Sequence, residues 1–171
     1  MQNITPFLWF DNQAEEAVNF YVSIFSKYDS PDKITKIDHI ARYDEAGAKA
    51  SGKSVGSIMV MAFQLRGQSF TALNGGPYFQ FNEAVSFVVN CDTQDEVNYF
   101  WDKLTEGGDE SAQQCGWLKD KYGLSWQIVP LPFINILNSP DKETAAKAMS
   151  IMLRMKKLDI NELEKLLGEG D

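Results

Sequence analysis

The sequence has few of the residues that hold metal ions, form disulfides or bind nucleic acids. It contains one histidine, two cysteines and fewer basic than acidic residues, with a formal net charge of −8. Cys91 and Cys115 lie far apart and lack companion ligands, which favours buried free thiols over a zinc site or a disulfide framework. Binding to phosphates needs clustered Lys and Arg, so the acidic charge argues against a nucleic-acid partner.

Long apolar runs and targeting signals are also missing. No apolar run approaches the roughly 20 residues that cross a bilayer, and no basic segment followed by an apolar core stands at the N-terminus. We therefore expect a cytoplasmic protein with no membrane partner. The 171 residues, 44% hydrophobic and 23% charged, are enough for one well-filled domain with a tail.

One pattern occurs twice, about eighty residues apart. Each copy has an alternating apolar run, a polar turn and an amphipathic helix. The runs are residues 4–10 and 84–90, and the helices are residues 14–25 and 93–104, the second with Thr93 and Glu96 as a capping box. Two copies are too few for a solenoid, so the pattern predicts a pseudo-twofold domain whose halves share one sheet and frame a cleft.

The segments after each helix predict further strands. Two strands are predicted over residues 33–43 and 55–65, with a mobile loop over 44–54 between them. A turn at Arg66–Gly67 connects the second strand to a third over 68–73 in a hairpin. In the second copy, residues 115–120 and 123–130 form a hairpin turned at 121–122. We predict an α+β fold of two β-α-β-β-β modules, about 1–76 and 77–132, forming a curled half-barrel.

The composition changes after residue 132, and residues 133–171 predict a C-terminal helical extension. A helix start is predicted at residues 139–141, with Ser139 as the N-cap. A second helix start is predicted at Asp159, where a cap residue is again followed by an acidic residue, Glu162. We expect two helices that lie against the domain or, as the less favoured alternative, against a partner subunit.

Strand alternation assigns side chains to the two faces of the sheet. It places Thr5, Phe7 and Trp9, together with Ser86, Val88, Asn90 and Gln127, on the face that lines the cleft. Trp101 and Trp126 fall on the opposite, helix-covered face, and we expect both in the core.

The chain resembles the PhnB-like group of the vicinal oxygen chelate, or glyoxalase/bleomycin resistance/dioxygenase, superfamily, whose members often carry the label 3-demethylubiquinone-9 3-methyltransferase. The matching segments are 6–10, 14–17, Phe20 with Tyr21, 72–77 and, most specifically, 115–130. The resemblance covers roughly residues 4–130 and implies the paired β-α-β-β-β fold. The tail resembles the C-terminal extension of longer members.

Metal-dependent members of that superfamily place His, Gln or Glu on the first and last strands of each module. Those positions correspond here to Thr5, Ala72 or Leu73, Ser86 and Gln127, of which only Gln127 is a plausible ligand. His39 lies at none of them, and Asp38 beside it is expected to face the other way. We therefore expect no metal ligands and no cofactor.

The methyltransferase label finds no support in a motif. Binding S-adenosylmethionine in the common way requires a glycine-rich turn that opens a helix, whereas residues 74–77 end in a proline and precede an aromatic strand. Residues 107–108 end a helix rather than begin one. Cys115 would need a base to act as a nucleophile, and only His39 offers an imidazole, so we favour a structural thiol.

The remaining candidates describe a pocket with aromatic walls and a few neutral polar groups, which is typical of small-molecule binding. They are Phe7, Trp9, Asn74, Tyr78, Ser86, Asn90, Trp117 and Gln127. The prediction is metal-free binding of a small, partly aromatic molecule, against the alternative that these aromatics only fill the core. The rival is a divalent-metal lyase, isomerase or dioxygenase using Gln127 and further ligands such as His39.

We also predict a homodimer, with the strand over 55–65 as a pairing edge.

Overall fold

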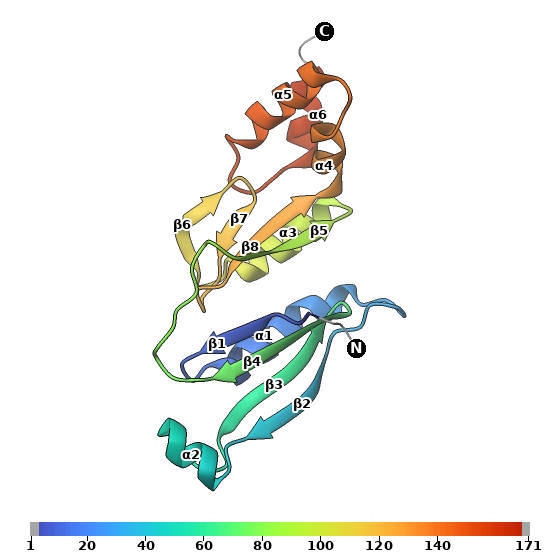
Figure 1. The fold of residues 1–171 in the computed structure, drawn as a ribbon. Helices are drawn as coiled ribbons and strands as arrows, with labels where there is room; N and C mark the ends of the chain where they lie inside the picture. The colour runs from blue at the N-terminus through green and yellow to red at the C-terminus, as the bar shows by residue number, and fades with distance from the viewer. Residues whose placement is uncertain (1–3, 169–171) are drawn as a thin grey trace. The chain divides into compact units, whose positions relative to one another are not determined.

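The computed structural model describes residues 4–168, which form two compact units that divide after Gln80. Each unit contains one four-stranded sheet with a helix packed on it (Figure 1). The predicted α+β fold of two β-α-β-β-β modules followed by helices is confirmed. The prediction that the two halves share one sheet is wrong, because the eight strands form two sheets of four, one in each unit.

The first unit follows the predicted order with one additional helix. Its elements are β1 (Phe7–Phe10), α1 (Ala14–Phe25), the 3-10 helix η1 (Ser26–Tyr28), β2 (Lys36–Arg42), α2 (Glu45–Ser51), β3 (Ile58–Leu65) and β4 (Gln68–Asn74). The strand order is β1-β4-β3-β2, with β1 parallel to β4 and the other neighbours antiparallel. Helix α1 packs on β3 and β4 through Ala17, Val18 and Tyr21, all fully buried. The spacing of these residues places them on one helix face.

Two predictions for this unit are wrong. The segment predicted as a mobile loop contains α2, because Asp44 caps the helix by accepting a hydrogen bond from the Gly47 amide (2.7 Å), and Gly52 ends it in a left-handed conformation. Strand β3 is not an edge, because it lies between β4 and β2. The predicted turn at Arg66–Gly67 is confirmed, with φ of 47° and 83° as in a type I′ hairpin.

The second unit repeats the arrangement with a shorter segment between its helix and the last two strands of its sheet. Its sheet has β5 (Ser86–Cys91), β6 (Asp109–Gln114), β7 (Trp117–Lys119) and β8 (Ser125–Pro130) in the order β5-β8-β7-β6, and α3 (Gln94–Leu104) packs on it. The Thr93 capping box is confirmed, since the Thr93 hydroxyl accepts from the Glu96 amide at 3.2 Å. Trp101 and Trp126 are buried as predicted.

The C-terminal extension has three helices where two were predicted: α4 (Leu131–Leu137), α5 (Lys142–Met152) and α6 (Ile160–Gly168). Helix α4 follows Pro130 and contains a proline in its first turn, where proline is tolerated. The N-cap of α5 is Asp141 rather than Ser139, and Asp159 accepts from the Glu162 amide as expected. Around a shared core, the helices bury Phe133, Ala148, Ile151, Leu158 and Leu163.

The extension belongs to the second unit and is bound to the β6–β7 turn of its sheet. The amides of Cys115 and Gly116, in the β6–β7 turn, donate to the carbonyls of Met155 and Lys156, each at 2.8 Å. These bonds satisfy backbone groups at the turn and fix the segment between α5 and α6. Among residues 4–168, no helix is long and apolar enough to span a membrane.

Candidate functional site

The predicted site residues fall into two groups, one on each unit, mostly on the sheet face that points away from the packed helix. We call this face of each sheet its open face. On β1, Leu8 and Phe10 are buried under α1, so Phe7 and Trp9 point to the open face of the first sheet. Phe7 is 59% exposed there, and Trp9 is half-buried.

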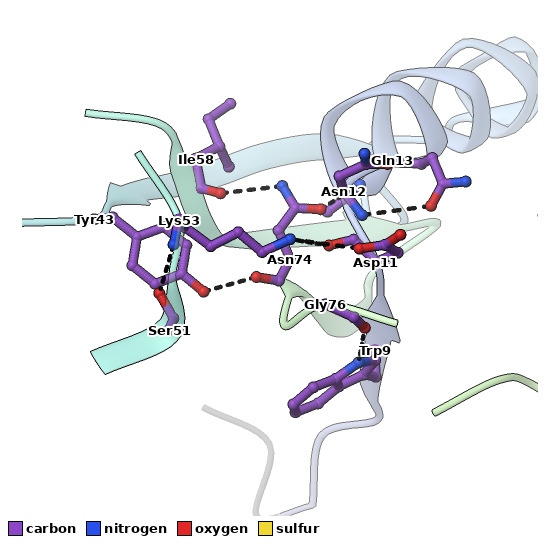
Figure 2. Close-up of polar contacts among 11 residues, drawn as sticks. Trp9, Asp11, Asn12, Gln13, Tyr43, Ser51, Lys53, Ile58, Asn74 and Gly76 are labelled. Atoms are coloured by element: carbon purple, nitrogen blue, oxygen red, sulfur yellow. Dashed lines mark hydrogen bonds and ion pairs between the residues drawn. The ribbon is translucent and has the colours of Figure 1, made fainter. Parts of the chain in front are cut away.

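Trp9 is held in place by the segment that follows β4. Its indole N–H donates to the Gly76 carbonyl at 2.8 Å, and its ring meets Phe79 edge-on at 5.0 Å (Figure 2 shows the hydrogen bond). A β-carbon at Gly75 would overlap the Trp9 ring, so only glycine permits this approach. The sequence signalled the glycines and the aromatic run but not their contact with Trp9. Tyr78 lies in the same segment and is 77% exposed.

Asn74 is buried and its side chain supports the fold of the first unit. Its Oδ1 accepts from the Ala14 amide at 2.8 Å and its Nδ2 donates to the Ile58 carbonyl at 3.0 Å. Its backbone carbonyl accepts from the Tyr43 hydroxyl at 2.7 Å (Figure 2). Because Gln13 makes no side-chain cap, Asn74 satisfies the first amide of α1 in its place.

The segment after α2 is tied to the same end of β1. Lys53 Nζ donates to the Asp11 carbonyl at 2.8 Å and lies 3.4 Å from the Asp11 carboxylate (Figure 2). The lysine side chain is only 22% exposed, so the contact is partly shielded from solvent. The polar residues at this end of the first sheet therefore bind one another.

The open face of the second sheet combines an indole with neutral polar groups. Val89 and Cys91 of β5 are buried under α3, which leaves Ser86 and Asn90 on the open face. Gln127 Nε2 donates to Ser86 Oγ at 2.9 Å, and Trp117 stands directly opposite Gln127 on the neighbouring strand. Structure therefore brings together three predicted residues from β5, β7 and β8.

Two carboxylates near this face have hydrogen-bond partners. Lys119 bonds the carboxylate of Glu83, and this bond holds the pKa of Glu83 below its usual value. At the same end of the sheet, hydrogen bonds from Ser111 lower the pKa of the Asp109 carboxyl. Cys115 is half-buried in the β6–β7 turn, and desolvation raises the pKa of its thiol, which disfavours the reactive thiolate. No local sequence signal indicates the Lys119–Glu83 pair, because its members are 36 residues apart.

The residues at the superfamily's metal positions do not fit a metal ion. Thr5 is exposed, Ala72 is buried among apolar groups, and Ser86 and Gln127 bond to each other. Hydroxyl and amide groups without an anionic or imidazole partner are a poor donor set for a divalent ion. Within residues 4–168, no group of three or more His, Cys, Asp or Glu side chains is placed to hold one.

His39 lies exposed on β2, across from Ala62. The expectation that Asp38 faces away from it is wrong, because a β-bulge between Ile37 and His39 interrupts the alternation. The Asp38 carboxylate accepts from Gln64 Nε2 at 2.8 Å, and Lys36 lies 2.9 Å away, so its pKa is lowered by these partners.

Two β-α-β-β-β units with this strand order define the glyoxalase/bleomycin resistance/dioxygenase, or vicinal oxygen chelate, class. The family model described as 3-demethylubiquinone-9 3-methyltransferase matches residues 2–129, and the chain belongs to that family. None of the curated proteins compared with the chain matches it.

The chain is also similar to proteins of solved structure, of which the first below supports this assignment. The PhnB protein from Bacillus cereus is 35% identical over 75% of this chain and 99% of its own, with a TM-score of 0.60. Protein PA1353 from Pseudomonas aeruginosa is 18% identical over 76% of this chain and 98% of its own, with a TM-score of 0.49. The fosfomycin resistance protein FosX from Listeria monocytogenes is 9% identical over 85% and 98%, with a TM-score of 0.48.

Proposed function

We propose that this protein binds small, partly aromatic molecules on the open face of each sheet, without a metal ion. The observation that carries the proposal is the make-up of those faces. The first sheet presents the indole of Trp9, and the second presents the indole of Trp117 beside neutral hydroxyl and amide groups. The positions that hold metal ligands in metal-dependent members carry unsuitable residues. Apolar walls with a few oriented polar groups suit an uncharged or weakly polar small molecule.

Different contacts hold the two indole side chains in place, so the contribution of each indole to binding can be measured separately. Trp9 is fixed by the Gly76 carbonyl and by Phe79, so its ring loses little freedom when it meets a ligand. Trp117 is held by its strand and stands next to Gln127. Methyl transfer is not proposed, because in the described chain Gly75 and Gly76 follow β4 without opening a helix.

Calorimetric titration with a panel of aromatic compounds tests the proposal, since heat reports binding even when an indole is removed. We expect Trp9→Ala or Trp117→Ala to weaken binding at least about tenfold, as large aromatic contacts dominate small-molecule affinity. Tyr28→Ala, outside both open faces, is the control and should bind as the wild type. Full binding by both tryptophan variants would refute the proposal.

Metal analysis of protein purified without chelator or metal resin tests the metal-free part. We expect a substoichiometric content of divalent ions. About one ion per chain, lost in Gln127→Ala, would favour the rival metal-dependent enzyme instead.

A further inference from the structure

The hydrogen-bonded pair of Ser86 and Gln127 presents unused donors and an acceptor at the open face of the second sheet. Gln127 Nε2 donates one hydrogen to Ser86 Oγ at 2.9 Å, and both residues are half-buried. Within the described chain, the Gln127 Oε1 atom, the second Nε2 hydrogen and the Ser86 hydroxyl hydrogen have no side-chain partner. This leaves one acceptor and two donors side by side.

From this array we infer that the ligand carries an uncharged carboxamide, lactam or urea-type group that binds the Ser86–Gln127 pair. The inference rests on the proposed function and specifies its ligand. A carbonyl oxygen of the ligand accepts from the free donors, and its N–H donates to Gln127 Oε1. Both bonds pair neutral groups, so neither partner has to bury a charge.

A carboxylate fits the same place poorly. All of its oxygens are acceptors, so one of them would face the lone pairs of Gln127 Oε1. The nearest cation on the neighbouring strand, Lys119, is engaged by Glu83. An anion would therefore lose hydration without gaining an ionic partner.

Trp117 indicates what the polar group is attached to. It stands opposite Gln127 in the β7–β8 register, where cross-strand side chains on one face approach closely. An aromatic ring bonded to the carboxamide would lie on the indole while the amide reaches the pair. The ligand class is thus an aryl carboxamide or a cyclic equivalent.

Side-chain amide NMR with benzamide, benzoate and toluene at neutral pH tests this inference. We expect benzamide to shift the Gln127 side-chain amide signals and to bind about tenfold more tightly than benzoate, the difference made by roughly one hydrogen bond. Gln127→Leu and Ser86→Ala should each lower benzamide affinity by about five- to tenfold and leave toluene binding unchanged. The exposed Gln80→Leu is the matched control, and circular dichroism checks that the variants are folded.

The outcomes separate the inference from the proposed function. Equal binding of the three probes near Trp117, with no shift at the Gln127 amide, overturns the inference and leaves the proposed function intact. Failure of every aromatic probe to perturb Trp9 or Trp117 overturns both. Tighter binding of benzoate than benzamide overturns the neutral-ligand assignment.

Discussion

At the scale of single residues, Asn74 shows how one side chain can hold a module together. Its amide bonds the Ala14 amide and the Ile58 carbonyl, which lie 60 and 16 residues away in the chain. Asn74→Ala removes both bonds and leaves two backbone groups buried without partners. We expect a loss of about 2 to 4 kcal/mol in the free energy of unfolding, measured by urea denaturation.

Two further variants define the origin of that loss. Asn74→Asp keeps an acceptor for Ala14 but removes the donor to Ile58, so its stability should fall between wild type and Asn74→Ala. Asn12→Ala, at an exposed neighbouring asparagine, should change stability by less than about 0.5 kcal/mol. Wild-type stability in Asn74→Ala would show that water replaces both bonds.

At the scale of elements, Gln94 connects α3 to the C-terminal extension. Its Oε1 accepts from the Ile160 amide at 2.8 Å, and its Nε2 donates to the Leu158 carbonyl at 3.2 Å. Gln94→Ala leaves the start of α6 without this cap. We therefore expect the free energy of local opening of residues 158–168 to fall by about 1 to 2 kcal/mol. Hydrogen–deuterium exchange measured by mass spectrometry reports this as faster exchange of that peptide.

Asp95→Ala, on the same helix and exposed, is the control for this experiment and should exchange like wild type. Equal exchange in Gln94→Ala and wild type would mean that the apolar core around Leu158 and Leu163 holds the extension without the cap.

At the scale of the whole molecule, the prediction of a homodimer remains, with a changed choice of pairing edge. Strand β3 is interior, and the edges of the first sheet are β1 and β2. An edge strand offers unpaired backbone groups to a second copy. We expect sedimentation equilibrium to give twice the 19.3 kDa chain mass at micromolar concentration. A mass equal to one chain across that range would refute the dimer.

Local signals predicted much of the fold because their physics is local. The spacing of Ala17 and Tyr21 predicted the face of α1, Thr93 with Glu96 predicted the start of α3, and Arg66–Gly67 predicted a hairpin. The short helices α2 and α4 were missed, although the cap of α2 at Asp44 was present in the sequence.

The candidate site was also predicted only in part from local signals. Strand alternation placed Phe7, Trp9, Ser86 and Gln127 correctly on the open faces, since side chains alternate along any strand. It did not foresee that Asn74 is used by the fold, because that depends on the parallel pairing of β1 with β4. The bulge beside Asp38 likewise reversed a side chain that simple alternation had assigned.

By itself the sequence determined the repeated module, its helices and its alternating faces, because these follow from side-chain periodicity and from caps within a few residues. Tertiary structure alone decided the strand order, the support of Trp9 by Gly76 and Phe79, and the pairing of Ser86 with Gln127. The Ser86–Gln127 hydrogen bond joins residues 41 positions apart, and the Trp9–Gly76 hydrogen bond joins residues 67 positions apart. Bonds over such separations depend on which strands pair, and strand pairing is fixed by the packing of the whole unit.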